Sequence, residues 1–270
     1  RAIADAGPRI VRLSLAGARE NLFAELPRKK SETPHGDYFL RGGHRLWHSP
    51  EAMPRTYLPD NAGVTIQPVE GGVRLWQPTE ALTGITKNIE LRLDPKRAVA
   101  TITHRLLNDG AATVEFAPWA ITMLPLGGTA ILPQTVGAID EAGLLPNRNL
   151  ALWPYTRIAD ARLELGDDLI QIQAHAALPA LKIGFMNRHG WLAYLRNGTL
   201  FVKRFKPQPD RAHPDFDCNT EIYCNDEFIE LETLGPLTRL QPGQSVSHVE
   251  TWEVYSGVTD QSLVDKLVTE

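Results

Sequence analysis

The sequence predicts an all-β protein, a large antiparallel β-sandwich with a short C-terminal helix. Three observations lead to this prediction: apolar and polar residues alternate with a period of two, turn residues interrupt the alternation about every 8 to 12 positions, and one C-terminal stretch has helical periodicity. The 270 residues are 43% hydrophobic and 22% charged, as in chains with a full core. We expect a single domain over 1–270, because β-sandwiches of this size commonly fold as one unit.

The alternating segments form a series of hairpins in chain order. The first segment, 9–16, ends at Gly17. The strongest hairpin signal is Asn197-Gly198, because both residues tolerate the positive φ of a tight turn. The paired segments are 64–67 with 73–77, 88–93 with 98–107, 162–165 with 169–175, 191–195 with 199–205, and 221–224 with 228–233. Residues 247–255 form a further alternating segment, and the series predicts antiparallel sheets packed face to face.

The C-terminal stretch and three irregular stretches complete the chain. Asp260 can cap a helix over 261–268, whose apolar stripe is suited to sealing a sheet edge. The stretches 27–38, 51–62 and 207–219 are rich in Pro, Gly and charge and lack strand periodicity. Long irregular loops in sheet proteins often carry function, so we expect functional residues near them.

Charge and cysteine content exclude several classes of function. The net charge is −4, the pI is near 6.1, and the one basic cluster, 28–30, lies beside Glu32, which argues against nucleic-acid binding. No apolar run approaches the roughly 20 residues of a membrane span, so we expect a soluble protein, cytoplasmic or exported with its signal peptide absent from this chain. Cys218 and Cys224 would lie about 20 Å apart on an extended strand, which predicts free thiols. The sequence does not indicate an oligomeric state.

The densest polar cluster is the segment 41–48. On a strand, His44 and His48 share one face, and Arg45 and Trp47 share the other. A guanidinium beside an indole suits a sugar, because the ring stacks on its apolar face while the guanidinium donates to hydroxyls. The alternative is a core Trp with its Arg and His neighbours bonded to backbone carbonyls.

A second cluster carries paired acidic residues. Glu221 and Tyr223 share one strand face, as do Glu230 and Glu232. Two carboxylates in register cannot both be buried cheaply, because like charges raise each other's pKa. Either this face is solvated, or one Glu is held partly protonated, as a general acid or base at neutral pH requires.

A third cluster, 213–217, places His213, Asp215 and Asp217 at alternate positions. This arrangement is compatible with an oxygen-rich cation site, but it lacks the Gly and the distal Glu of a calcium-binding EF loop. We therefore predict no metal and no cofactor, with a structural or site cation such as calcium not indicated.

Several longer motifs carry a family resemblance over nearly the whole chain. They are GGHRLWHSPE at 42–51, YLPDN at 57–61, FAPWAITMLPLGG with ILPQ at 116–134, FIELETLGPL at 228–237 and HVETWEV at 248–254. With these motifs the chain resembles an uncharacterised bacterial domain family of the galactose-mutarotase-like (aldose 1-epimerase-like) superfamily. The resemblance implies a galactose-mutarotase-like fold, a large antiparallel β-supersandwich.

The resemblance also implies roles for individual residues. In aldose 1-epimerases a Glu in a similar LETQ stretch is the general base on the anomeric hydroxyl, a role that Glu232 would inherit. Arg45 matches an Arg that binds the sugar, and Asn108 resembles an Asn in a central strand. Trp119 stands where relatives carry the His that protonates the ring oxygen, and Trp has no proton that titrates near neutral pH. His44, His48 or His104 would then supply the proton, or the site binds sugar without this chemistry.

Three hypotheses about function follow. The first is a protein that binds a sugar or oligosaccharide and interconverts its anomers, with Glu232 as base and His44 as acid. The second is a noncatalytic carbohydrate-binding module with Trp47, Trp119 and Tyr223 as stacking surfaces. The third is a structural or partner-binding sandwich. The first two require the early guanidinium and the late carboxylates to meet in one hollow.

Overall fold

The computed structural model describes residues 1–2, 5–260 and 264–266. The strands of the first half are β1 (Arg9–Ile10), β2 (Glu25–Thr33), β3 (Gly36–Gly42), β4 (His44–Ser49), β5 (Thr65–Val69), β6 (Gly72–Trp76), β7 (Ile85–Leu93), β8 (Val99–Asn108), β9 (Val114–Pro125) and β10 (Thr129–Pro133). The later elements are β11 (Ala151–Leu152), β12 (Leu163–Leu165), β13 (Leu169–Gln173), β14 (Leu181–Phe185), β15 (Trp191–Arg196), β16 (Thr199–Phe205), α1 (Pro214–Asp217), β17 (Thr220–Cys224), β18 (Phe228–Leu234), β19 (Thr238–Leu240) and β20 (Ser245–Ser256).

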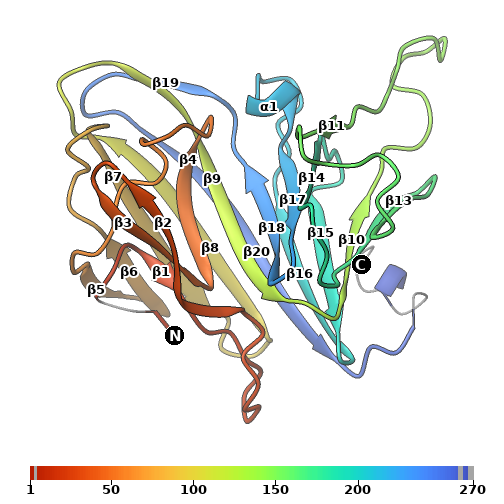
Figure 1. The fold of residues 1–270 in the computed structure, drawn as a ribbon, viewed down its shortest axis with the longest axis horizontal. Helices are drawn as coiled ribbons and strands as arrows, with labels where there is room; N and C mark the ends of the chain where they lie inside the picture. Colours follow the sequence, from red (N-terminus) through yellow and green to blue (C-terminus); the bar gives the residue numbers. More distant parts are fainter. Residues whose placement is uncertain (3–4, 261–263, 267–270) are drawn as a thin grey trace.

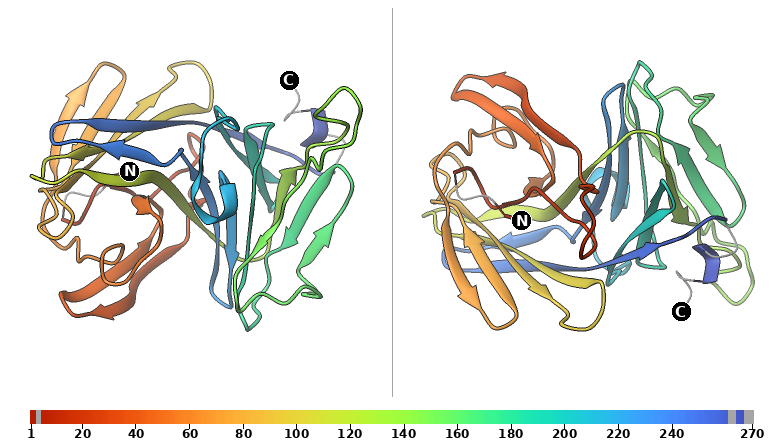
Figure 2. Two further views of the ribbon diagram at one scale, coloured as in Figure 1. Left: turned by 90° about the horizontal axis from the view of Figure 1, so that it is seen from above. Right: turned by 90° about the horizontal axis from the view of Figure 1, so that it is seen from below.

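Two large antiparallel sheets form the protein, as the period-two pattern predicts. The eight-stranded sheet has the order β1-β4-β9-β18-β17-β14-β11, with β19 paired to β9. The ten-stranded sheet has the order β12-β13-β10-β15-β16-β20-β8-β7-β6-β5, and β2 and β3 form a separate hairpin. Figure 1 shows β9, β18, β17 and β14 crossing the middle of the molecule, and Figure 2 shows the β2–β3 hairpin standing to one side of the layered strands.

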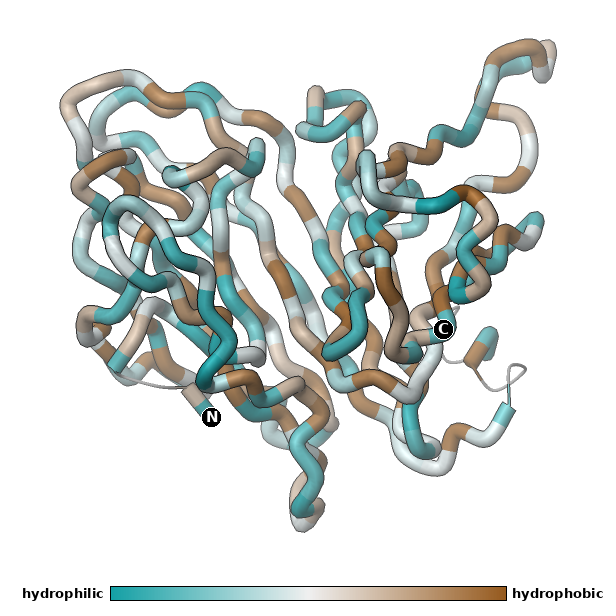
Figure 3. The backbone as a smooth tube through the Cα atoms, viewed as in Figure 1, coloured by the Kyte–Doolittle hydropathy of each residue, from teal (hydrophilic) through white to brown (hydrophobic). Residues whose placement is uncertain are grey.

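The main core lies between the two sheets. Ile229 and Leu231 of β18 belong to one buried cluster with Ile102 and Leu106 of β8. The residues between them on β18 point to the opposite face, because side chains alternate along a strand. Figure 3 shows this alternation as changes between teal and brown along the central strands. We call the surface of the eight-stranded sheet that points away from this core its outer face.

The predicted hairpins are confirmed, with local corrections. Asn197 and Gly198 have φ of 51° and 70° and join β15 to β16. The stretch 27–38, predicted to be irregular, belongs instead to the β2–β3 hairpin, whose register shifts between Leu26 and Lys30. That shift breaks the sequence periodicity. The early segment 9–16 is a strand only at Arg9–Ile10.

Two glycines fix the start of β4. Gly42 and Gly43 have φ of 79° and 70°. A Cβ on Gly42 would lie 2.0 Å from the carbonyl oxygen of Ala24, and a Cβ on Gly43 would lie 2.5 Å from the carbonyl oxygen of Ile10. Only glycine allows this approach, as the sequence indicated. This close approach fixes the position of β4 in the sheet and thereby decides which of its residues lie on each face.

Helical structure is sparse in the described residues. The predicted helix over 261–268 lies largely outside them; within it, 264–266 are helical and Val264 is buried against Val258 and Leu200. In α1, Asp215, Phe216 and Asp217 all have φ between 53° and 63°. This left-handed conformation costs about 1–2 kcal/mol per residue for side chains with a Cβ. No helix in the described residues is long and apolar enough to cross a membrane. Cys218 and Cys224 are free thiols, as predicted.

Candidate functional site

A cleft of about 730 Å³ lies on the outer face of the eight-stranded sheet. Its volume is in the range of small-molecule sites. The strands contribute Arg45, Trp47, Trp119, Lys182, Tyr223 and Glu230. The walls come from the β2–β3 hairpin and from the irregular segments around Tyr57, Trp153 and Leu178. The cleft therefore combines aromatic rings with charged groups of both signs.

The first charged group of the floor is an ion pair between β4 and β18. Arg45 Nη1 lies 2.9 Å from Glu230 Oε1, and both side chains are largely buried. The Arg45 guanidinium carbon is 4.2 Å from the centre of the Trp47 ring. The Trp47 indole donates to the Tyr38 hydroxyl at 2.8 Å, which fixes the plane of that ring. An early guanidinium and a late carboxylate therefore meet in one hollow, but this carboxylate is Glu230 and not the predicted Glu232.

The second charged group centres on Lys182 of β14. Its Nζ lies 2.8 Å from Glu221 Oε2 and 3.3 Å from Glu232 Oε2. The same Nζ is 4.6 Å from the ring centres of Trp119 and of Trp153, so the two indoles flank the ammonium. Glu221 and Glu232 face each other across β17 and β18, which brings the predicted acidic residues together.

Protonation keeps this second group close to neutral. Burial would lower the pKa of Lys182, but the carboxylates of Glu221 and Glu232 outweigh burial and raise it well above its ordinary value. Burial raises the pKa of Glu221 well above its ordinary range, opposed by Lys182 and reinforced by the charge of Glu232. One ammonium thus faces two carboxyl groups, and the raised pKa of Glu221 favours its protonated form.

Glu232 is held below the floor rather than at it. Its Oε2 accepts a hydrogen bond of 2.7 Å from the Trp119 indole, and its side chain is fully buried. Glu230, two residues earlier, lines the cleft, as does the exposed Glu51. Burial also raises the pKa of Glu230, although Arg45 opposes the rise. The carboxylates that could reach a ligand are therefore Glu230 and Glu51, whereas the sequence prediction placed this role on Glu232.

Six buried polar atoms of these two groups have no hydrogen-bond partner in the described part of the chain. They are Arg45 Nε and Nη1, Glu221 Oε1 and Oε2, Glu230 Oε1 and Glu232 Oε1. Three of the six, Arg45 Nη1, Glu230 Oε1 and Glu221 Oε2, are engaged in the ion pairs. The atoms with neither a hydrogen bond nor an ion pair are Arg45 Nε, Glu221 Oε1 and Glu232 Oε1. Since buried polar groups in native proteins are nearly always hydrogen-bonded, these atoms mark where further hydrogen bonds can form.

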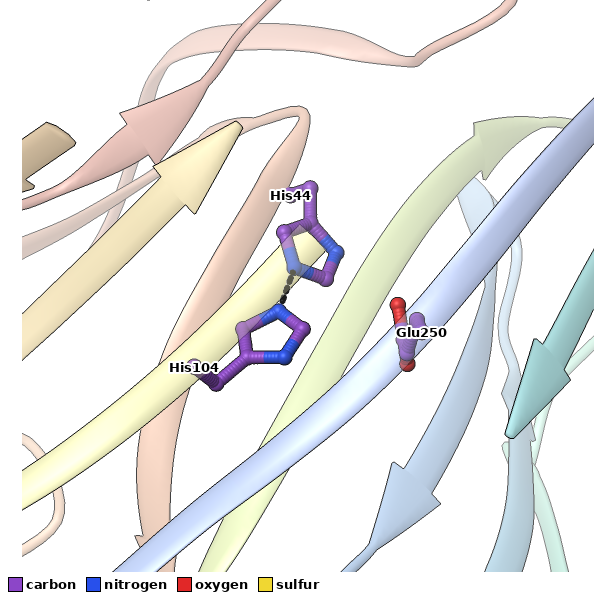
Figure 4. Close-up of side chains that lie close together, drawn as sticks. All are labelled: His44, His104 and Glu250. Carbon is purple, nitrogen blue, oxygen red and sulfur yellow. Dashed lines mark hydrogen bonds between the residues drawn. The ribbon is translucent and has the colours of Figure 1, made fainter. Parts of the chain in front are cut away.

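His44 points away from the cleft, into the space between the sheets. Its Nδ1 lies 2.9 Å from the Thr122 hydroxyl and its Nε2 lies 2.7 Å from Nε2 of His104, as Figure 4 shows for the histidine pair. Burial lowers the pKa of His44 well below its ordinary value and also lowers that of His104. The prediction that His44 protonates a bound sugar is therefore not supported, because both rings are buried outside the cleft.

The two histidines and Glu250 bring their ligand atoms within 4.8 Å of one another, a spacing that a metal ion could use. However, Lys203 Nζ lies 2.9 Å from Glu250 Oε1, and the Trp252 indole donates to Glu250 Oε2 at 2.7 Å. The ammonium already balances the carboxylate and both oxygens are occupied. We therefore assign this group, with the Thr233 hydroxyl that also donates to Glu250, a structural role between the sheets.

Two other predicted residues also lie outside the cleft. His48 is buried on the inner side of β4, with Nε2 3.2 Å from Glu80 Oε2 and its ring stacked on Phe116. Asn108 closes the turn after β8: its amide donates to the carbonyls of Ala112 and Leu240 at 2.9 Å. Neither lines the cleft, and their side chains serve local structure.

Sequence reasoning missed Lys182 and the aromatic wall. The signal for Lys182 was a single cation in the apolar run 181–185, which a buried strand does not tolerate without a partner. Trp153 and Tyr155 lie in a segment with no periodicity, so nothing in the pattern indicated where their rings point.

The fold has solved relatives at low sequence identity. No family model matches the sequence, and no curated protein matches it either. A TPR-domain containing protein from Parabacteroides distasonis has a TM-score of 0.63 at 15% identity, covering 96% of this chain and 46% of that chain. A putative mutarotase from Salmonella typhimurium has a TM-score of 0.55 at 12% identity, covering 92% of this chain and 84% of that chain. The chain has the galactose-mutarotase-like fold.

A third structure agrees with this assignment. A putative aldose 1-epimerase from Escherichia coli K12 has a TM-score of 0.50 at 17% identity, covering 87% of this chain and 82% of that chain. The galactose-mutarotase-like fold implied by the sequence motifs is therefore confirmed. This chain spans about half the length of the Parabacteroides protein. Since a fold hosts many activities, function has to be argued from the cleft.

Proposed function

We propose that the cleft binds a carbohydrate. The observation that carries the proposal is the Arg45–Glu230 pair, set among indole rings with polar atoms still unbonded. A sugar hydroxyl both donates and accepts, so it suits a guanidinium and a carboxylate together, while its apolar face suits Trp47 or Trp119. The putative mutarotase and the putative aldose 1-epimerase that share the fold are named for sugar chemistry, which agrees with this choice.

The charge balance favours a neutral ligand. Arg45 is paired with Glu230, and Lys182 contacts both Glu221 and Glu232, so each of these two cations already has a carboxyl partner. An anionic ligand would have to compete with carboxylates already in place, and a cationic one with Arg45 and Lys182. A neutral sugar perturbs neither pair and adds hydrogen bonds to both.

Calorimetric titration with D-glucose, D-galactose and their oligosaccharides tests the proposal. We expect saturable binding that Glu230→Gln weakens at least about tenfold, because an amide cannot pair with Arg45 as a carboxylate does. Glu90→Gln is the matched control, since Glu90 pairs with Arg74 on the other sheet. Absence of binding by every sugar, or equal weakening by both substitutions, would contradict the proposal.

Acid–base catalysis on the bound sugar is a second candidate function. The observation in its favour is the raised pKa of Glu230, which lets this carboxyl group hold a proton nearer neutral pH. No histidine lines the cleft in the described residues, so one of its two carboxyl groups, Glu230 or Glu51, would serve as the acid. Proton NMR of freshly dissolved α-glucose and α-galactose separates the two functions: acceleration of anomer exchange that Glu230→Gln abolishes supports catalysis, and exchange at the buffer rate leaves binding alone.

A further inference from the structure

A second, smaller cavity adjoins the cleft. It measures about 250 Å³ and is lined by 151–154 together with Asp215 and Phe216 of α1. Trp153 lines both this cavity and the cleft. Because the two cavities share this residue, a ligand longer than one sugar unit is the kind that could contact both.

Phe216 is presented to solvent by a backbone that is held in place. Its side chain is 88% exposed, although it is one of three successive residues with left-handed φ. The Asn149 amide donates to the Phe216 carbonyl at 3.0 Å, and Asp217 Oδ1 accepts from the His213 N–H at 2.9 Å. A strained conformation kept by surrounding bonds, with an apolar ring directed outward, is typical of a binding surface.

The small cavity, like the cleft, combines apolar surface with a carboxylate. Phe216 and Pro154 supply apolar surface, and the half-buried Asp215 supplies a carboxylate that accepts hydrogen bonds. The volume is roughly that of eight water molecules, which leaves room for a single pyranose unit. An apolar platform with one acceptor at its edge is again an arrangement that suits a sugar ring.

We propose that the ligand is an oligosaccharide that spans both cavities, with one unit beyond Trp153 stacking on Phe216 and donating a hydroxyl to Asp215. This inference rests on the proposed carbohydrate binding and adds the length of the ligand and a second subsite to it. The sequence motif 213–217, which matches no calcium loop, then has a role as the platform of that subsite.

Calorimetry with sugars of increasing length tests the second subsite. Three series serve as probes. The first is glucose, maltose and maltotriose; the second is glucose, cellobiose and cellotriose; the third is galactose and lactose. In the series that binds, affinity should rise with length in the wild type. Phe216→Ala should remove about 3- to 10-fold of affinity from the longer sugars and leave the monosaccharide affinity unchanged. Phe216→Trp should keep the gain, because the indole preserves the stacking surface.

Val249→Ala is the control, since Val249 is an exposed apolar residue on β20 of the other sheet. Affinity that does not rise with length, or equal length dependence in Phe216→Ala and the wild type, overturns the second subsite while cleft binding stands. If no sugar binds, the carbohydrate proposal fails and the subsite fails with it. A cooperative thermal unfolding transition in each variant, as in the wild type, confirms that the substitution leaves the fold intact.

Discussion

Two buried charged clusters lie back to back on the eight-stranded sheet, and they differ in how completely their polar atoms are bonded. Between the sheets, Lys203 contacts Glu250 at 2.9 Å and also donates to the Leu231 carbonyl at 3.0 Å, and both Glu250 oxygens are occupied. On the outer face, the Arg45 and Lys182 groups hold six of the eleven buried side-chain atoms that have no hydrogen-bond partner in the described residues.

The difference arises from alternation along single strands. His44 and Arg45 are neighbours on β4, and Glu232 and Thr233 are neighbours on β18, yet each pair divides between the two clusters. In the fully bonded cluster, removing Lys203 or Glu250 would leave a buried charge alone, which is strongly destabilising. A cluster with unbonded atoms costs stability unless a ligand completes it. The comparison teaches that incomplete bonding, rather than charge or burial, separates the candidate site from the core.

The largest effect should come from breaking the core cluster. Lys203→Met leaves Glu250 buried without its cation, and we expect the free energy of unfolding to fall by about 3–5 kcal/mol. Urea denaturation followed by circular dichroism measures it. A loss below about 1 kcal/mol would mean that the core cluster contributes no more than a surface pair does.

The equivalent change in the cleft should be far milder. Gln keeps an oxygen that can accept a hydrogen bond from Arg45, and both side chains line the cleft, so we expect Glu230→Gln to lower the free energy of unfolding by about 1–2 kcal/mol. The same denaturation experiment applies. If Glu230→Gln destabilises the protein as much as Lys203→Met does, the two clusters are equivalent and the contrast between them is wrong.

The pH dependence of stability should differ in sign between the two clusters. His248 belongs to the core cluster, because its Nε2 lies 2.7 Å from the Thr233 hydroxyl. Burial lowers the pKa of His248 to about 3. Between about pH 6.5 and pH 3 the unfolded chain therefore binds a proton that the folded protein does not. As the pH decreases through this range, the free energy of unfolding falls by about 1.4 kcal/mol per pH unit for this group. His248→Gln should flatten the slope of unfolding free energy against pH by that amount.

The pKa of Glu230 is raised, so its contribution to the free energy of unfolding is instead lost as the pH rises above the ordinary carboxyl pKa. Glu230→Gln should remove this decrease in stability. Urea denaturation at successive pH values measures both slopes, and slopes unchanged by either substitution would contradict the assignment.

The smallest effect concerns the strained turn beside the cleft. Phe216→Gly removes the penalty of a left-handed side chain, and we expect it to stabilise the protein by about 1 kcal/mol. Thermal unfolding measures the gain as a higher midpoint temperature. A lower midpoint would mean that the Phe216 ring packs in the fold rather than being presented to a ligand.

The sequence predicted the fold and the two faces of β4 because both depend on local periodicity. The alternation that separates His44 from Arg45, and the Gly42-Gly43 approach, are properties of adjacent residues. It did not predict which face would be completed by partners. His44 was expected in the cleft because the family resemblance implies a histidine acid and Trp119 stands in its place, but the partner of His44, His104, lies on β8 and becomes a neighbour only through sheet packing. Lys182 was missed for the same reason. Its partners Glu221 and Glu232 lie on β17 and β18, and they become its neighbours only through two strand pairings.

Two indole N–H groups allow the most direct test of the account. Trp119 donates to Glu232 under the cleft, and Trp252 donates to Glu250 in the core. In ¹⁵N–¹H NMR spectra recorded during titration with the glucose- and galactose-based sugars, the Trp119 indole signal should shift with saturation while the Trp252 signal stays fixed. If no sugar moves the Trp119 signal, or if both signals move alike, the outer face of the sheet is not the ligand site.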